Sequence, residues 1–201
     1  MISVITEHIK RFADEFPELV ELVPWEIPSI LGAYIRQRIT TLGNDYSTSN
    51  EIAIHKSAIV EGPVTLKGPV IIGPHCFVAA NAYLRGGVIL SEKVSVGPGC
   101  EIKTTIILRG SALAHFNFIG DSVVGSNVNF EAGSVVANHF NERDDKHIQV
   151  RIGDRVIDTG CIKFGALIGD RCKIGANAVL SPGTMLFPNT IVKRLELVQQ
   201  I

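Results

Sequence analysis

Residues 55–90 read HKSAIV EGPVTL KGPVII GPHCFV AANAYL RGGVIL when they are divided into sixes. From Ile54 to Leu108 every sixth residue is a large aliphatic, and Ala114 comes next. The residue four positions after each of these is apolar and mostly small, from Ala58 to Phe118. Such a six makes a short strand and a tight turn with both of these side chains pointing inward, and three sixes close one triangular coil. The sequence therefore predicts a parallel β-helix whose coils stack about 4.8 Å apart.

The period does not hold along the whole chain. It slips near His115 and again before Val124, continues to Val136, and returns from Ile168 to Val192. We therefore expect a β-helix domain at residues 51–201, with an irregular loop at about 138–165. Residues 1–50 show helical spacing of apolar residues interrupted by prolines. They predict a small helical appendage, with a helix over 29–42, that caps the open end of the β-helix.

Composition narrows the classes of function. The 201 residues carry a net charge of -1, so no basic excess points to nucleic acid as a partner. There is no apolar run of about 18 residues and no secretory pattern at the start, so we expect neither a membrane span nor a signal peptide. The four cysteines form no CxxC pair, which predicts small buried thiols in a reducing cytoplasm and no metal site.

Departures from the smooth repeat are candidate sites. Arg85 and Lys103 lie eighteen residues apart, one full coil, and should stack on one corner. Neighbouring like charges cost energy unless an anion joins them, so a phosphate would satisfy both; the alternative is two solvated turn residues. His115 faces outward and can act as a general base near pH 7, or is a surface histidine at a turn. Asn129 and Asn138 border the loop, where asparagine often serves only the turn.

These columns resemble the left-handed parallel β-helix family of hexapeptide-repeat acyltransferases, and the left hand is implied by that resemblance. Five segments are similar, in order and spacing, to the acetyltransferase domain of the bifunctional UDP-N-acetylglucosamine pyrophosphorylase/glucosamine-1-phosphate N-acetyltransferases. They are Tyr83–Arg85, Cys100–Lys103, Ala114–Asp121, Val128–Gly133 and Ala137–Asn138. The stretch Asp158–Asp170 resembles the archaeal sugar-phosphate versions, and the whole resemblance covers about residues 52–193.

The resemblance implies a homotrimeric N-acetyltransferase that uses acetyl-CoA and an amino-sugar phosphate such as glucosamine 1-phosphate. It implies that Arg85 and Lys103 hold the sugar phosphate and that His115 is the general base on the amine. The backbone N–H of Ala132 would stabilise the thioester oxyanion. It also implies that further residues bind sugar or acyl donor, namely Phe118, Asn129, Asn138 and, for the acetyl-CoA, Lys146.

Departures from the family pattern keep two alternatives open. Phe118 and His139 each stand where the family usually has Tyr, and Glu131 stands where it usually has Gly. The fifty residues before the β-helix are too few for a nucleotidyltransferase domain. One alternative is an acyltransferase with another sugar or another donor, such as an acyl-carrier protein. The other is a non-catalytic trimeric module that binds sugar phosphate.

Overall fold

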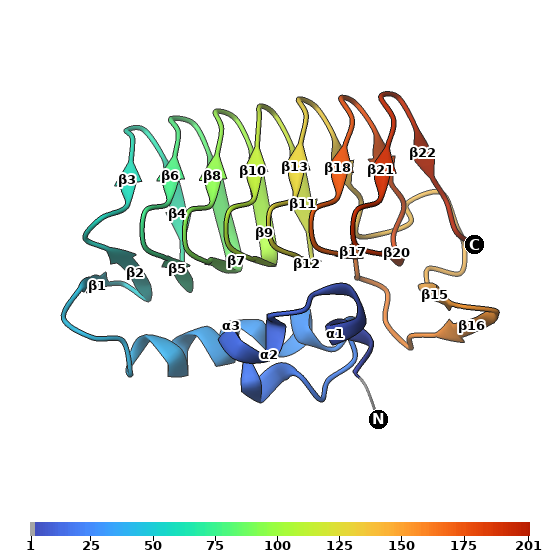
Figure 1. Ribbon diagram of the computed structural model, residues 1–201, viewed down its shortest axis with the longest axis horizontal. Coiled ribbons are helices and arrows are strands. Elements are labelled where there is room, and N and C mark those ends of the chain that lie inside the picture. Colours follow the sequence, from blue (N-terminus) through green and yellow to red (C-terminus); the bar gives the residue numbers. More distant parts are fainter. Residues whose placement is uncertain (1–2) are drawn as a thin grey trace.

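A computed structural model describes residues 3–201 as a parallel β-helix with helices along one side (Figure 1). The mainly β, left-handed hexapeptide fold predicted from the repeat is confirmed. Each coil has three faces. The chain passes first through the face that we call covered, then through the back face, and then through the open face. The back face is a seven-stranded parallel sheet of β3 (Ile59–Val60), β6 (Phe77–Val78), β8 (Ser95–Val96), β10 (Ala112–Leu113), β13 (Asn129–Phe130), β18 (Lys173–Ile174) and β21 (Ile191–Val192).

The other two faces share the long strands β7 (Tyr83–Leu90) and β9 (Glu101–Ile107), which bend around a corner. The open face holds their first halves with β4 (Thr65–Lys67), β11 (Phe118–Gly120), β14 (Val135–Val136), β19 (Val179–Leu180) and β22 (Leu197–Val198). The covered face holds their second halves with β2 (Ile52–His55), β5 (Val70–Ile72), β12 (Val123–Val124), β17 (Ala166–Ile168) and β20 (Thr184–Leu186).

The slip in the repeat lies earlier than predicted. Between β7 and β9, Arg85 pairs with Lys103 but Val88 pairs with Thr105, so the coil is one residue shorter at Thr104. The inward residue after Ile102 is consequently Ile107, whereas Leu108 packs beneath the helices. The expected slip at His115 and the inward position of Leu108 were therefore wrong. Three consecutive aliphatic residues at 106–108 hid the change of phase.

The shorter coils also bring polar side chains into the interior. Asn117 is 2% exposed, and its amide donates hydrogen bonds of 2.7 Å to Ser134 Oγ and to the carbonyl of Glu131. Ser111 is fully buried and its hydroxyl donates to the carbonyl of Gly125. The prediction of an apolar column through Ala112 and Phe118 was wrong, because the slip puts Ser111 and Asn117 in the inward positions instead. Buried amides and hydroxyls are tolerated there because they find hydrogen-bond partners.

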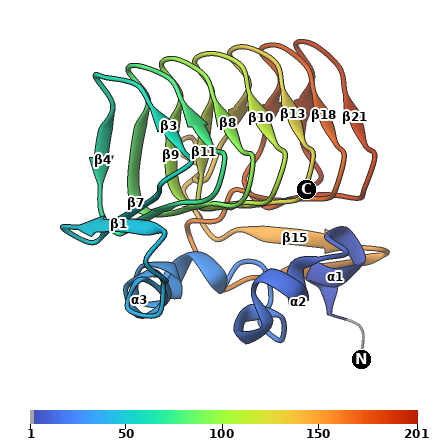
Figure 2. The same ribbon diagram turned by 60° about the vertical axis from the view of Figure 1, so that its left-hand side comes forward.

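The N-terminal segment runs along the β-helix instead of closing its end. It comprises α1 (Val4–His8), α2 (Phe12–Glu15), a short 3₁₀ turn at Pro17–Leu19 and α3 (Ile27–Ile39). Figure 2 shows these helices beneath the covered face. There Leu31 and Ile35 of α3 join a second apolar core with outward side chains of the covered face, such as Ile71, Ile89 and Ile106. The predicted cap was wrong for the helices, although β1 (Tyr46–Ser49) does pair with β2 at the edge of the first coil.

Residues 138–165 leave the coil between β14 and β17. They include an antiparallel hairpin of β15 (Gln149–Ile152) and β16 (Arg155–Asp158), which lies beside α1 in Figure 1. Cys76, Cys100 and Cys172 are buried free thiols, as predicted, whereas Cys161 in this insertion is only half-buried. Within residues 3–201 no helix combines the length and apolar character that crossing a membrane requires.

Candidate functional site

The two predicted phosphate-binding cations lie on the corner between the open and covered faces. Arg85 and Lys103 are register partners on adjacent strands, as the repeat predicts. Each already has a carboxylate, since Arg85 Nη2 is 2.6 Å from Glu101 Oε1 and Lys103 Nζ is 2.7 Å from Asp121 Oδ2. The repulsion between the cations is thus compensated within the chain. An added phosphate would share the cations with these carboxylates, and the lysine ammonium keeps two further N–H donors for it.

Asp121 joins this corner to the insertion. Its carboxylate is nearly buried and also accepts a hydrogen bond from the amide of Asn138. Gly120 makes that contact possible: a Cβ there would lie 2.7 Å from Asn138 Nδ2 and 3.0 Å from Phe118 Cζ. Phe118, Asn138 and Lys103 therefore form one continuous surface from the open face to the corner.

His115 and Ala132 lie on the opposite corner, between the back and open faces, on adjacent coils. The N–H of Gly133 donates to the carbonyl of His115 at 2.8 Å, which fixes the two turns against each other. The His115 side chain is exposed, and within residues 3–201 its imidazole makes no hydrogen bond. The N–H of Ala132 likewise has no partner in that part of the chain. A proton acceptor and a free amide donor are thus neighbours at one corner.

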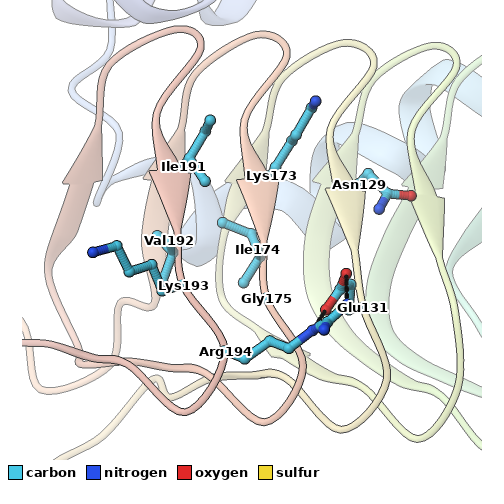
Figure 3. Close-up of a pocket in the computed structure, with 9 residues that line it drawn as sticks. All are labelled: Asn129, Glu131, Lys173, Ile174, Gly175, Ile191, Val192, Lys193 and Arg194. Carbon is cyan, nitrogen blue, oxygen red and sulfur yellow. Dashed lines mark hydrogen bonds and ion pairs between the residues drawn. The ribbon is translucent and has the colours of Figure 1, made fainter.

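Asn129 lies on the back face and lines a groove of about 460 Å³ (Figure 3). Glu131 also lines this groove. Its carboxylate accepts hydrogen bonds from the Arg194 guanidinium at 2.7 and 2.9 Å and from the Ala176 N–H at 2.9 Å. These bonds, that of Arg194 first, lower the pKa of Glu131 to about 2. The carboxylate that departs from the family pattern is therefore neutralised by the chain itself. Lys173 and Lys193 add two exposed cations to the groove.

The candidate residues thus lie in separate places within one chain. One corner holds Arg85, Lys103 and Asn138, and the other holds His115 and Ala132. Asn129 lies on the back face, and Phe118 lies on the strand between the corners. Lys146 is half-buried in the insertion, and no hydrogen bond or ion pair in the described chain joins it to another candidate. Phe130 is fully buried in the core and is therefore not available for a contact with a neighbouring subunit.

Two family models match parts of the chain. One, described as the C-terminal domain of GMPPB, matches residues 66–157, and the other, described as a hexapeptide repeat of succinyl-transferase, matches residues 149–182. Together with the stacked coils, the second match decides the kind of repeat. The chain is built of hexapeptide repeats.

Relatives of this hexapeptide-repeat protein include longer chains. A bifunctional sugar-1-phosphate nucleotidylyltransferase/acetyltransferase of Sulfurisphaera tokodaii is 34% identical over 42% of this chain and 22% of its own length. The bifunctional protein GlmU of Methanococcus maripaludis is 33% identical over 40% of this chain and 19% of its own. The match thus spans about a fifth of these relatives. A solved Bacillus cereus N-acyltransferase, AntD, with dTDP and coenzyme A bound, has 14% identity and a TM-score of 0.30 over 78% of this chain and 81% of its own.

Several site residues of this hexapeptide-repeat protein escaped the sequence reasoning. Glu101 and Asp121 each lie one coil from the cation that they neutralise, at spacings of 16 and 18 residues, and that spacing was a usable signal. Arg194 reaches Glu131 over 63 residues because the insertion separates their coils. The length of the insertion hides such a pair from any periodic pattern.

Proposed function

We propose that this chain transfers an acyl group from a CoA thioester to the amine of an amino-sugar phosphate, with acetyl-CoA and glucosamine 1-phosphate as its substrates. The observation that carries the proposal is the corner where His115 and the free N–H of Ala132 are neighbours. The cations Arg85 and Lys103 lie across a strand of three residues, β11, which spans about 10 Å. The amine and the phosphate of glucosamine 1-phosphate lie on adjacent sugar carbons, so the base and the cations that serve one substrate would come from adjacent subunits.

In this mechanism the imidazole of His115 accepts a proton as the amine attacks the thioester carbonyl. The N–H of Ala132 donates to the developing oxyanion, which stabilises the negative charge. Collapse of the intermediate breaks the C–S bond and leaves an amide, and the proton on His115 passes to the leaving thiolate. No covalent bond to the protein is needed. Positioning and the general base supply the acceleration, the latter about 10²–10⁴-fold.

The groove on the back face is our proposed position for the acyl donor. The ion pair with Arg194 removes the repulsion that a free Glu131 would exert on the phosphates of CoA. Lys173 and Lys193 are exposed cations within the same groove. Asn129 lines it beside Glu131, while Asn138 and Lys146 stay proposed contacts to the sugar and the donor.

We also propose that the working form is a homotrimer in the cytoplasm with sites between adjacent subunits. Phe116 is 72% exposed at the His115 corner, where a large apolar side chain suits a subunit contact. A second copy would bring another corner to His115. Light scattering on a size-exclusion column tests this, because the proposal requires three chains of 21.8 kDa in one particle.

Acyl transfer is tested by incubating the protein with acetyl-CoA and glucosamine 1-phosphate and following release of the thiol. His115→Ala should lower kcat about 10²–10⁴-fold. His147→Ala is the matched control, because His147 is exposed in the insertion and, among residues 3–201, its side chain pairs only with Asp145. Transfer at the normal rate by His115→Ala, or no transfer by the unaltered protein with any amino-sugar phosphate, would contradict the proposal.

A second candidate function is binding of sugar phosphate without transfer. It is favoured by one observation, that no hydrogen bond within residues 3–201 orients the imidazole of His115, whereas catalytic imidazoles usually have such a partner. Thermal shift separates the two candidates. A ligand at about 100 times its Kd adds about 2.7 kcal/mol of stability, so stabilisation by glucosamine 1-phosphate but not by acetyl-CoA would support binding alone or another acyl donor.

A further inference from the structure

A hollow of about 400 Å³ adjoins the corner that carries the two cations. Three parts of the chain build it: the start of α3, the turn at Asp121 and the end of the insertion. The first and third of these lie outside the hexapeptide repeat. The lining residues are Trp25, Pro28, Ser29, Asp121, Gly160, Cys161, Ile162 and Lys163. The volume is within the range of small-molecule sites, about 300–1,000 Å³.

The hollow lies on the far side of the cations from His115. Asp121 belongs to its lining and is the residue that Lys103 and Asn138 contact. Between His115 and Asp121 runs β11, which carries Phe118 on the open face. Along the surface the order is therefore general base, open face, cations and hollow. A phosphate held at the cations has the open face on one side and this hollow on the other.

Trp25 gives the hollow an aromatic wall. The indole is half-buried and meets the ring of Phe164 edge-on, with centroids 6.4 Å apart and planes at 70°. Phe164 is fully buried, so it supports the indole from the side of the protein. An aromatic ring held in this way can stack on another planar ring. Every nucleotide base has a planar face, so a base of any type can stack on such a ring. Lys163 is exposed nearby and forms no ion pair within residues 3–201.

We propose that the preferred acceptor is a nucleoside diphosphate amino sugar, in which a nucleoside monophosphate is attached to the phosphate of the amino sugar. This inference rests on the proposed acyl transfer and names its substrate class. The amine lies at the adjacent subunit's His115, the diphosphate lies at Lys103 and Lys163, and the base stacks on Trp25. A sugar monophosphate would leave the hollow without an occupant. The N-terminal segment then has a role in recognition, since it supplies the stacking ring.

The kinetic test compares UDP-glucosamine with glucosamine 1-phosphate as acceptors for acetyl-CoA, using the full chain. The unaltered protein should have the higher kcat/KM with UDP-glucosamine. Trp25→Ala should lower the ratio of kcat/KM for UDP-glucosamine to kcat/KM for glucosamine 1-phosphate at least about five-fold, because KM for UDP-glucosamine rises. Trp25→Phe keeps an aromatic ring and should retain most of this preference. Ile30→Ala is the matched control: Ile30 is 40% exposed on α3, the helix that follows Trp25, lies outside the lining, and its substitution should leave the ratio unchanged.

A binding test needs no catalysis, because Trp25 is the single tryptophan of the chain. Titration with UDP should change its fluorescence, and Lys163→Ala should raise the apparent Kd several-fold. Unchanged emission at saturating UDP, or a Trp25→Ala ratio equal to that of the unaltered protein, would overturn the inference while leaving acyl transfer to glucosamine 1-phosphate intact. A fluorescence response without transfer to either acceptor would instead overturn the proposed function and leave the nucleotide site standing.

Discussion

At the scale of single residues, the Glu131–Arg194 pair sets a pH dependence. The pKa of Glu131 is about 2 in the folded chain, because Arg194 and the Ala176 N–H stabilise the ionised carboxylate, against 4.5 for an unperturbed group. A lowered folded pKa gives stability that is complete above about pH 4.5 and is lost as the pH falls toward 2. We expect Arg194→Ala to raise the pKa of Glu131 toward 4.5, as measured by NMR titration of its side-chain carbon.

The matched control for that titration is Lys193→Ala. Lys193 is an exposed cation in the same groove and makes no side-chain bond to Glu131 in the described structure. Its removal should leave the pKa of Glu131 low. Titration of Glu131 near 4.5 in the unaltered protein would show that the ion pair does not persist in solution.

A second prediction at this scale concerns Phe130, which is fully buried on β13. Removing its ring leaves a cavity in a close-packed interior, so Phe130→Ala should lower the free energy of unfolding by about 3–5 kcal/mol. Val156→Ala, at a side chain that is 45% exposed on β16, should change it by no more than about 0.5 kcal/mol. Denaturant unfolding measures both, and equal small losses would place Phe130 at the surface.

At the scale of elements, α1 depends on a buried histidine. His8 is 2% exposed, stacks on Phe187 with ring centroids 4.5 Å apart, and its Nδ1 lies 2.9 Å from the carbonyl of Val4. Burial lowers its pKa below 6.5, an effect opposed by the bond to Val4 and by the charge of Glu7. The unfolded segment therefore binds the proton more readily, and stability falls as the pH drops from 6.5 toward the folded pKa.

Hydrogen exchange tests this dependence. Protection factors of the amides in α1 and α2 should decrease between pH 7.5 and about 5.5, because protonated His8 is disfavoured in its buried place. His8→Phe keeps a ring against Phe187 without the titratable group, so its protection should stay level over that range. An identical decrease in His8→Phe would assign the effect to another group.

At the scale of elements, part of the fold can be predicted from the sequence and part cannot. Hexad spacing predicts the coils because one inward aliphatic column must continue from coil to coil. It does not locate the slip at Thr104, since Ile106, Ile107 and Leu108 offer equivalent side chains to either phase. The place of the helices did have a signal, namely outward aliphatics such as Ile71 and Ile89 spaced by one coil. The candidate site is less predictable: Trp25 reaches the cation corner through packing that no local pattern encodes.

At the scale of the whole molecule, the helices and the β-helix share an apolar core. Ile71, Ile89, Ile106, Val123 and Leu167 point outward from the covered face and are buried there. Deleting residues 1–45 would expose this row to water, so we expect the shortened chain to bind the dye ANS and to self-associate on size exclusion. A monodisperse shortened chain without dye binding would show instead that residues 51–201 fold alone, as the predicted domain division requires.

The hairpin of β15 and β16 departs from a corner and returns to the next coil, so the stack above and below it continues without it. Val123 and Leu167 remain neighbours in the ladder although 44 residues separate them. At the hairpin tip, Gly153 is exposed, and nothing lies within 4 Å of where its Cβ would be. That tip is therefore a place where a peptide tag or a second protein could be grafted into the chain, displayed at the side of the rod, while the coils keep their register.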